Sequence, residues 1–93
     1  MKYGVSLIDL TPDSRQVYGR NTGAIVDIVY EGSPAFDANI LGGDLIVSVN
    51  GSAVKNVDHV FSLIDKAKTA NAKTTTFGII RDKKNTDIVI KHR

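Results

Sequence analysis

Residues 23–51 read GAIVDIVYEGSPAFDANILGGDLIVSVNG, and this stretch decides the fold. It contains two runs rich in β-branched and other apolar residues, at 24–30 and 45–49, and such runs are typical of strands. Asn50-Gly51, directly after the second run, is a strong signal for a tight turn. The stretch therefore predicts two strands, the second of which ends in a tight turn.

A short helix is expected between these two strands. Ser33 can cap a helix and Pro34 suits the first helical position. The helix is predicted to run through Ala38. Asn39 is expected to end it, because asparagine tolerates the left-handed conformation better than most residues.

Toward the amino end, residues 5–10 read as a further strand. Thr11-Pro12-Asp13 then combines a capping residue, a proline suited to the first turn and an acid that favours the helix dipole. A short helix is predicted from there to about Val17, ending near Gly19. Gly23 opens the strand that follows.

Toward the carboxyl end, the longest helix is expected at 57–68, with Asn56 as its cap. Four apolar residues on one face of this helix are predicted to cover the core: Val57, Val60, Ile64 and Ala67. A hairpin should follow, with strands at 74–81 and 86–92 joined by a turn at 82–85. The order β-α-β-α-β-α-β-β predicts an α+β domain with a small, mostly antiparallel sheet and two or three helices.

Composition bounds the class of protein. The chain has 93 residues, which corresponds to one domain, and it has no cysteine for disulfides or thiolate chemistry. It lacks an apolar run long enough to cross a bilayer, so no direct membrane insertion is expected. Residues 55–93 carry nine basic and four acidic side chains. No aromatic residues interleave with these lysines, so no nucleic acid partner is expected.

Catalytic and metal chemistry find little support in the sequence. His59 and His92 lie far apart, and no Gly-x-Ser-x-Gly motif is present. Ser33 is better explained as a helix cap than as a nucleophile, and Asp44 as a turn carboxylate that bonds local backbone. No set of ligands is grouped for a metal. The chain is therefore not expected to be an enzyme, and no cofactor or metal is expected.

The same stretch, 23–51, resembles the PDZ-domain signature: a glycine-led strand, Gly-Ser-Pro-Ala, a short helix, Gly-Asp-x-Ile and Val-Asn-Gly. The resemblance extends over nearly the whole chain. The last strand stands where the bacterial, circularly permuted type places it, as in the periplasmic serine proteases of the high-temperature-requirement type. The resemblance implies a PDZ-like small antiparallel β-sandwich or partly open barrel capped by helices. It also implies a single domain, 1–93, excised from a larger protein.

On this resemblance, Lys2, Tyr3, Gly4 and Val5 line up with the carboxylate-binding loop of the family. Successive backbone N–H groups in a tight turn form a nest that binds anions. Glycine at position 4 permits the necessary backbone angles. Lys2 adds a positive charge nearby.

Peptide recognition is expected between a strand and a helix. The edge of the strand formed by Val5, Ser6, Leu7 and Ile8 would accept a peptide as an added antiparallel strand. Tyr3, Val5 and Leu7 should share one face and form the floor of a pocket for an apolar last residue. The opposite wall is assigned to a stripe on the long helix at His59, Leu63 and Lys66.

Two of these residues leave alternatives open. Leu63 either lines the groove or marks the boundary of the core. His59 either bonds a Ser or Thr two residues before the ligand's terminus, as the resemblance implies, or is an exposed histidine of the first turn.

The leading hypothesis is a module that binds C-terminal or extended peptides, as a regulatory or substrate-presenting part of a bacterial protease or envelope protein. The expected partners are protein or peptide C-termini with an apolar last residue, together with the parent protein's own domains. A periplasmic or envelope location follows if the parent is such a protease. The alternative is a PDZ-like docking domain with a blocked or vestigial groove.

Overall fold

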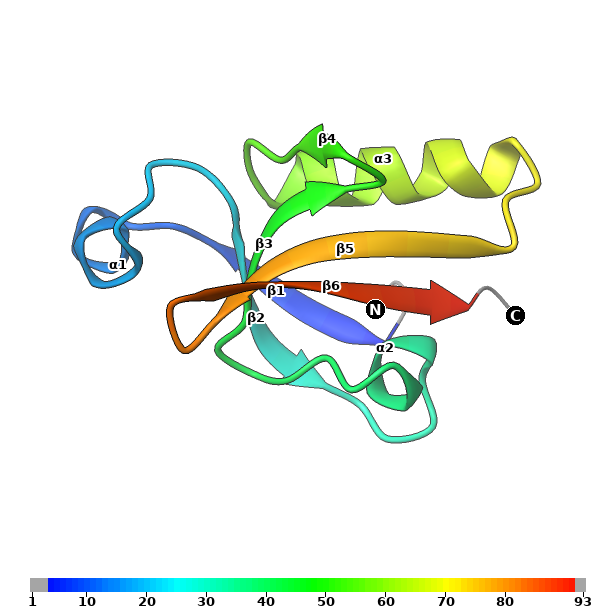
Figure 1. Ribbon diagram of the computed structural model, residues 1–93, viewed down its shortest axis with the longest axis horizontal. Helices are drawn as coiled ribbons and strands as arrows, with labels where there is room; N and C mark the ends of the chain where they lie inside the picture. The colour runs from blue at the N-terminus through cyan, green and yellow to red at the C-terminus, as the bar shows by residue number, and fades with distance from the viewer. Residues whose placement is uncertain (1–3, 92–93) are drawn as a thin grey trace.

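The computed structural model describes residues 4–91. Its elements in chain order are β1 (Val5–Asp9), α1 (Pro12–Tyr18), β2 (Ala24–Val29), α2 (Pro34–Asp37), β3 (Leu45–Val49), β4 (Ser52–Ala53), α3 (Val57–Thr69), β5 (Thr74–Arg81) and β6 (Lys84–Lys91). The strands form one antiparallel sheet in the order β1-β2-β3-β5-β6, with β4 beside β3. In Figure 1, α3 runs along one side of the β5–β6 hairpin, and α1 stands away from the rest of the molecule. The predicted α+β class and element order are confirmed.

The differences from the predicted elements lie at two turns. The two-residue strand β4 follows Asn50-Gly51, a turn in which both residues have positive φ. β6 begins at Lys84, two residues earlier than predicted, because Asp82 and Lys83 alone form the turn, with φ of 51° and 64°. Two-residue turns with positive φ at both positions match the twist of the strands that they join. Sequence reasoning missed this turn because lysine is an unusual residue for such a conformation.

Side chains cap all three helices as predicted. Thr11 Oγ1 accepts a hydrogen bond from the N–H of Ser14, and Gly19 ends α1 in the left-handed conformation. Ser33 Oγ accepts from the N–H of Phe36 at the start of α2. Asn56 Oδ1 accepts from the N–H of His59 at the start of α3. These bonds satisfy N–H groups that a helix start leaves without a partner.

The core lies between α3 and the inner face of the sheet. Val60 and Ile64 of α3 are buried, while Val57 and Ala67 are half-buried, so the predicted apolar stripe faces inward. Val60 and Ile64 belong to a cluster with buried side chains from β1, β2, β3, β5 and β6, among them Val5, Val26, Ile46, Phe77, Ile79 and Ile88, and Val57 packs against it. Phe61 and Leu63 also pack against this cluster. The inner face of α3 is therefore wider than the four predicted residues.

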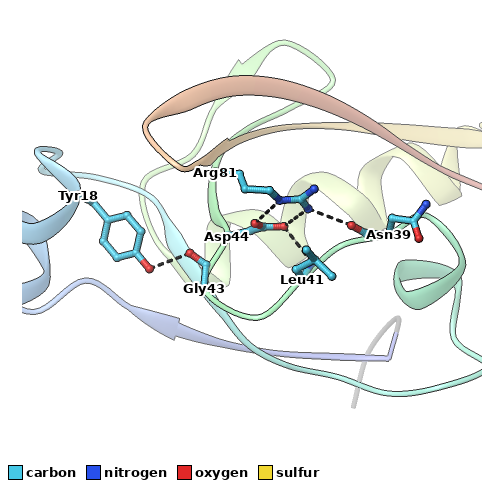
Figure 2. Close-up of polar contacts among 6 residues, drawn as sticks. All are labelled: Tyr18, Asn39, Leu41, Gly43, Asp44 and Arg81. Carbon is cyan, nitrogen blue, oxygen red and sulfur yellow. Dashed lines mark hydrogen bonds and ion pairs between the residues drawn. The ribbon is translucent and has the colours of Figure 1, made fainter.

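An ion pair between the buried carboxylate of Asp44 and the half-buried Arg81 fixes the loop between α2 and β3 (Figure 2). Asp44 is 2% exposed, and its carboxylate accepts hydrogen bonds from the N–H of Leu41 (2.9 Å) and from Nε of Arg81 (2.8 Å). The hydrogen bond to Asp44 raises the pKa of the Arg81 guanidinium above its ordinary value. Arg81 also donates to the carbonyl of Asn39. The loop is thus held to the end of β5, because a buried carboxylate requires such partners.

Tyr18 connects α1 to the same loop. Its hydroxyl donates a hydrogen bond to the carbonyl of Gly43 (2.8 Å), as Figure 2 shows. α1 buries none of its residues, and Val17 is 76% exposed. This short helix, which projects from the sheet, is therefore anchored by a polar contact and not by a buried apolar face.

Candidate functional site

β1 lies at one end of the sheet. Of the strands that the structure describes, only β2 pairs with it, so the other edge of β1 carries no strand. The β1–β2 register shifts between Ser6 and Leu7, where Asp27 is the extra residue of β2. A strand edge without a partner presents backbone N–H and C=O groups that can pair with another chain. We call this edge of β1, together with the stripe of His59, Leu63 and Lys66 predicted on α3, the β1–α3 site.

The side chains of β1 divide between the core and the surface. Val5 is 3% exposed and belongs to the core, while Leu7 is half-buried and packs against the same cluster. Ser6 is half-buried, and Ile8 and Asp9 are exposed. Val5 and Leu7 therefore both contact the core, and the floor of a ligand pocket expected from Tyr3, Val5 and Leu7 stays a prediction. The side chain of Val5 leaves little surface for a ligand.

Gly4 starts β1 in a conformation that suits glycine. Its φ is +76°, and its carbonyl accepts a hydrogen bond from the N–H of Tyr30 (2.9 Å). A Cβ atom on Gly4 would lie 2.0 Å from Cβ and 2.5 Å from Oγ of Ser33, the residue that caps α2. The chain therefore needs glycine here for two reasons, its backbone angle and its contact with Ser33. Lys2 and Tyr3 lie outside the described residues, and their roles in the carboxylate-binding loop stay predictions.

α3 runs antiparallel to β1, so its first turn lies at the far end of β1 from Gly4 (Figure 1). At that end Asp9 Oδ1 accepts a hydrogen bond from the N–H of Val57, the first residue of α3 (2.7 Å). Sequence reasoning missed Asp9. The two residues are 48 positions apart, and nothing in the local pattern around either one signals the contact.

His59 is half-buried in the first turn of α3. Its Nδ1 accepts a hydrogen bond from the backbone N–H of Lys55 (3.1 Å). In a neutral imidazole one ring nitrogen accepts and the other carries the proton. The bond from Lys55 therefore places the proton of His59 on Nε2, which is then a hydrogen-bond donor.

Leu63 and Lys66 continue the stripe along α3. Leu63 is half-buried and packs against the core, and Lys66 is exposed in the last turn. Leu63 thus combines core contact with partial exposure, which leaves both of its predicted roles open. Lys66 lies toward the end of the β1–α3 site at which Gly4 stands, because the helix and the strand run in opposite directions.

The described part of the chain contains no candidate metal site and no candidate membrane-spanning helix. Within 4–91, no group of three His, Cys, Asp or Glu side chains is placed to hold a metal ion. No helix in this range is both long and apolar enough to cross a bilayer. Asp44, considered as a turn carboxylate, bonds local backbone at Leu41 as predicted.

The sequence model of the PDZ domain family matches residues 3–91. The chain belongs to the PDZ domain family. Nearly the whole chain is covered by the match, so these residues form a PDZ domain and not a protease domain.

The PDZ domain also has relatives among known proteins. It is 30% identical over 92 residues to a probable periplasmic serine endoprotease, DegP-like, from Rickettsia prowazekii. The match covers 97% of this chain and 18% of that protein, so the chain spans less than a fifth of its relative.

Solved structures share the fold. The PDZ domain of HtrA3, bound to a phage-derived ligand (FGRWV), has a TM-score of 0.75 at 23% identity, covering 95% of this chain and 80% of that one. The HtrA-type protease AlgW, in its S227A form with a decapeptide, has a TM-score of 0.78 at 23% identity. That match covers 96% of this chain and 27% of AlgW. The predicted bacterial protease-type PDZ fold is confirmed.

The contact between Gly4 and Ser33 gives the first prediction. Replacing Gly4 by alanine imposes left-handed strain of about 1 kcal/mol and a steric overlap of about 1–3 kcal/mol. Gly4→Ala is therefore expected to lower the free energy of unfolding by about 2–4 kcal/mol in urea titrations.

Gly32→Ala is the matched control, since Gly32 has nearly the same φ (+78°) but, apart from its two chain neighbours, no residue within 4 Å of the point that a Cβ atom would occupy. It should cost only the strain, about 1 kcal/mol. Equal losses for the two variants would show that the Ser33 contact does not constrain the start of β1.

Proposed function

We propose that this PDZ domain binds the carboxyl-terminal segment of a partner protein as an additional antiparallel strand on β1. The observation that carries the proposal is the edge of β1, which has no strand partner among the described residues and lies beside α3. Peptides bind to such edges through main-chain hydrogen bonds, and side-chain pockets add selectivity. The PDZ domain of HtrA3 was solved with a phage-derived ligand and the protease AlgW with a decapeptide, which supports peptide binding by this domain.

The length of β1 sets the size of the ligand. β1 has five residues, so an added strand would pair over about five residues, one for one. A segment of this size buries little area and loses conformational freedom on binding. Affinities in the micromolar range or weaker are therefore expected, about −8 kcal/mol at best.

The end of the site at Gly4 would receive the ligand's terminus. We assign capture of the carboxylate to the backbone N–H groups of the loop at Lys2, Tyr3, Gly4 and Val5. Lys2 and Lys66 would add positive charge near that end of the site. Leu7 and Leu63, both half-buried, offer apolar surface on the facing elements. This arrangement favours ligands with a free carboxylate and an apolar last residue.

His59 would contact the ligand two residues before its terminus. Its Nε2–H is available as a donor because Nδ1 is occupied by the N–H of Lys55. A Thr or Ser hydroxyl two residues before the ligand's terminus could accept from this group.

The backbone of Gly4 faces β2, because its carbonyl accepts a hydrogen bond from the N–H of Tyr30. Alternate residues of an antiparallel strand direct their backbone groups to opposite sides, so Ser6 would also bond β2, and Val5 and Leu7 would offer N–H and C=O groups to the ligand.

The parent protein is proposed to be a larger bacterial protease of the periplasm, of which 1–93 is one domain. The support is the 30% identity to the periplasmic endoprotease of Rickettsia prowazekii, of which the chain covers 18%. In such a parent the domain would present substrate segments to the protease or respond to exposed chain ends.

Carboxylate capture is tested with a C-terminal peptide library that includes Phe-Gly-Arg-Trp-Val. The strongest free-acid five-residue binder is then the pentapeptide probe, and its amide is the matched control. Charge-assisted hydrogen bonds to backbone N–H groups contribute about 1.5–3 kcal/mol, so the amide should bind about 10- to 100-fold more weakly in calorimetry. Equal affinities would contradict carboxylate capture, and a library without any binder would contradict the proposed function.

The assignment of His59 is tested by the ratio of two affinities. Versions of the pentapeptide probe with Thr or Val two residues before the terminus are titrated into the unmodified domain and into His59→Ala. Loss of one hydrogen bond should weaken the Thr peptide by up to about tenfold and the Val peptide much less. His59→Ala also frees the N–H of Lys55, but that effect is common to both peptides. Equal losses would therefore exclude hydroxyl recognition.

A further inference from the structure

The hydrogen bond between Asp9 and Val57 joins the two elements that flank the β1–α3 site. Asp9 is the last residue of β1, and Val57 is the first residue of α3. The carboxylate reaches the helix backbone directly, with 2.7 Å between Oδ1 and N. The bond therefore spans the site at the end opposite Gly4.

A peptide added to β1 needs the space that this bond crosses. Neighbouring strands lie about 4.8 Å apart, so the added strand would run between β1 and α3. The aspartate side chain is short, and where it touches the helix backbone it leaves no room for a strand. A peptide that extends past Asp9 must either break the bond or leave the site.

We infer that the Asp9–Val57 hydrogen bond closes the far end of the peptide site and limits strand addition to the length of β1. This inference rests on the proposed function. Ligand residues beyond about the fifth from the terminus would then leave the edge of β1 and contribute little to affinity. Asp9 is a positioning residue in this account, since it acts by holding α3 against β1.

Electrostatics favour the closed arrangement. A carboxylate at a helix start is stabilised by the helix dipole, and a hydrogen bond to a charged acceptor is stronger than a neutral one. Asn56 Oδ1 accepts a hydrogen bond from the N–H of His59, and Asp9 Oδ1 accepts one from the N–H of Val57. Two N–H groups of the first turn therefore have side-chain partners. The charged side chains of Asp58 and Lys55 flank the same turn and are exposed.

The test compares peptide length in matched variants. The pentapeptide probe and a decapeptide, made by adding five alanine and serine residues to its amino end, are titrated into the unmodified domain, Asp9→Ala, Asp9→Asn and Asp13→Ala. Asp13 is an exposed acid in the first turn of α1 and serves as the control. The readout is the ratio of the two dissociation constants for each protein, which a general loss of folded protein does not change.

In the unmodified domain the added residues of the decapeptide should form no hydrogen bond with β1. The decapeptide should therefore bind within about twofold of the pentapeptide, since one further hydrogen bond would change the affinity by more than that. In Asp9→Ala the decapeptide should gain about three- to tenfold over the pentapeptide, as one further residue pairs with the strand edge. Asp9→Asn keeps an acceptor oxygen and should behave as the unmodified domain, as should Asp13→Ala. Amide exchange of Val57 should accelerate in Asp9→Ala and not in Asp9→Asn.

Other outcomes overturn the inference. If Asp9→Ala and the unmodified domain show the same ratio, or if the unmodified domain already gains from the longer peptide, the bond does not limit the site. Both results leave the proposed function intact, because the pentapeptide probe still binds. If neither peptide binds any of the four proteins, the proposed function fails and this inference fails with it.

Discussion

The fold has to keep one edge of β1 without a strand partner while holding that strand in place. Unpaired edges are a hazard in sheet proteins, because they can pair with other chains and aggregate. Here β1 is short and pairs with β2 along its other edge. Its two ends are fixed by contacts outside the sheet: Gly4 packs on Ser33 at one end, and Asp9 bonds the backbone of Val57 at the other. The exposed length of edge is therefore small and its position is defined.

The core cluster and the ion pair of Asp44 and Arg81 hold the elements around β1 in place. The core cluster joins α3 to β1, β2, β3, β5 and β6, so the helix beside the edge is held by the same apolar side chains that hold the sheet. The ion pair of Asp44 and Arg81 fixes the loop that follows α2 to the end of β5. α2 in turn begins at Ser33, the residue on which Gly4 packs. The position of Gly4 thus depends on contacts made by the loop and by α2, elements that no ligand needs to touch.

Much of the fold could be predicted because its signals are local. The neighbouring residues Thr11-Pro12 and Ser33-Pro34 each predict a helix start, and Asn50-Gly51 predicts a tight turn. The PDZ signature at 23–51 then supplied the topology. The candidate site was only partly predictable. The backbone freedom of glycine makes Gly4 predictable as part of the loop, but its contact with Ser33 depends on how β1 and α2 come together.

The contacts that the sequence did not reveal are long-range polar ones. Asp9 and Val57 are 48 residues apart, and Asp44 and Arg81 are 37 apart. Neither pair has a spacing that periodicity or capping rules could single out. The use of Nδ1 of His59 by Lys55 was missed for a different reason: it is a local bond, but it requires the helix start to be placed in three dimensions. These bonds decide how the site is shaped, whereas the pattern of apolar residues decides only that the strand and the helix are there.

Amide hydrogen exchange along β1 tests the central claim most directly. In the free domain, the amides of residues 5–9 that point away from β2 should exchange with little protection, while those bonded to β2 are protected. A saturating peptide with a free carboxylate should then protect the first group selectively. The account is contradicted if those outward amides are already protected in the free domain, or if the bound peptide leaves them unprotected and slows exchange elsewhere.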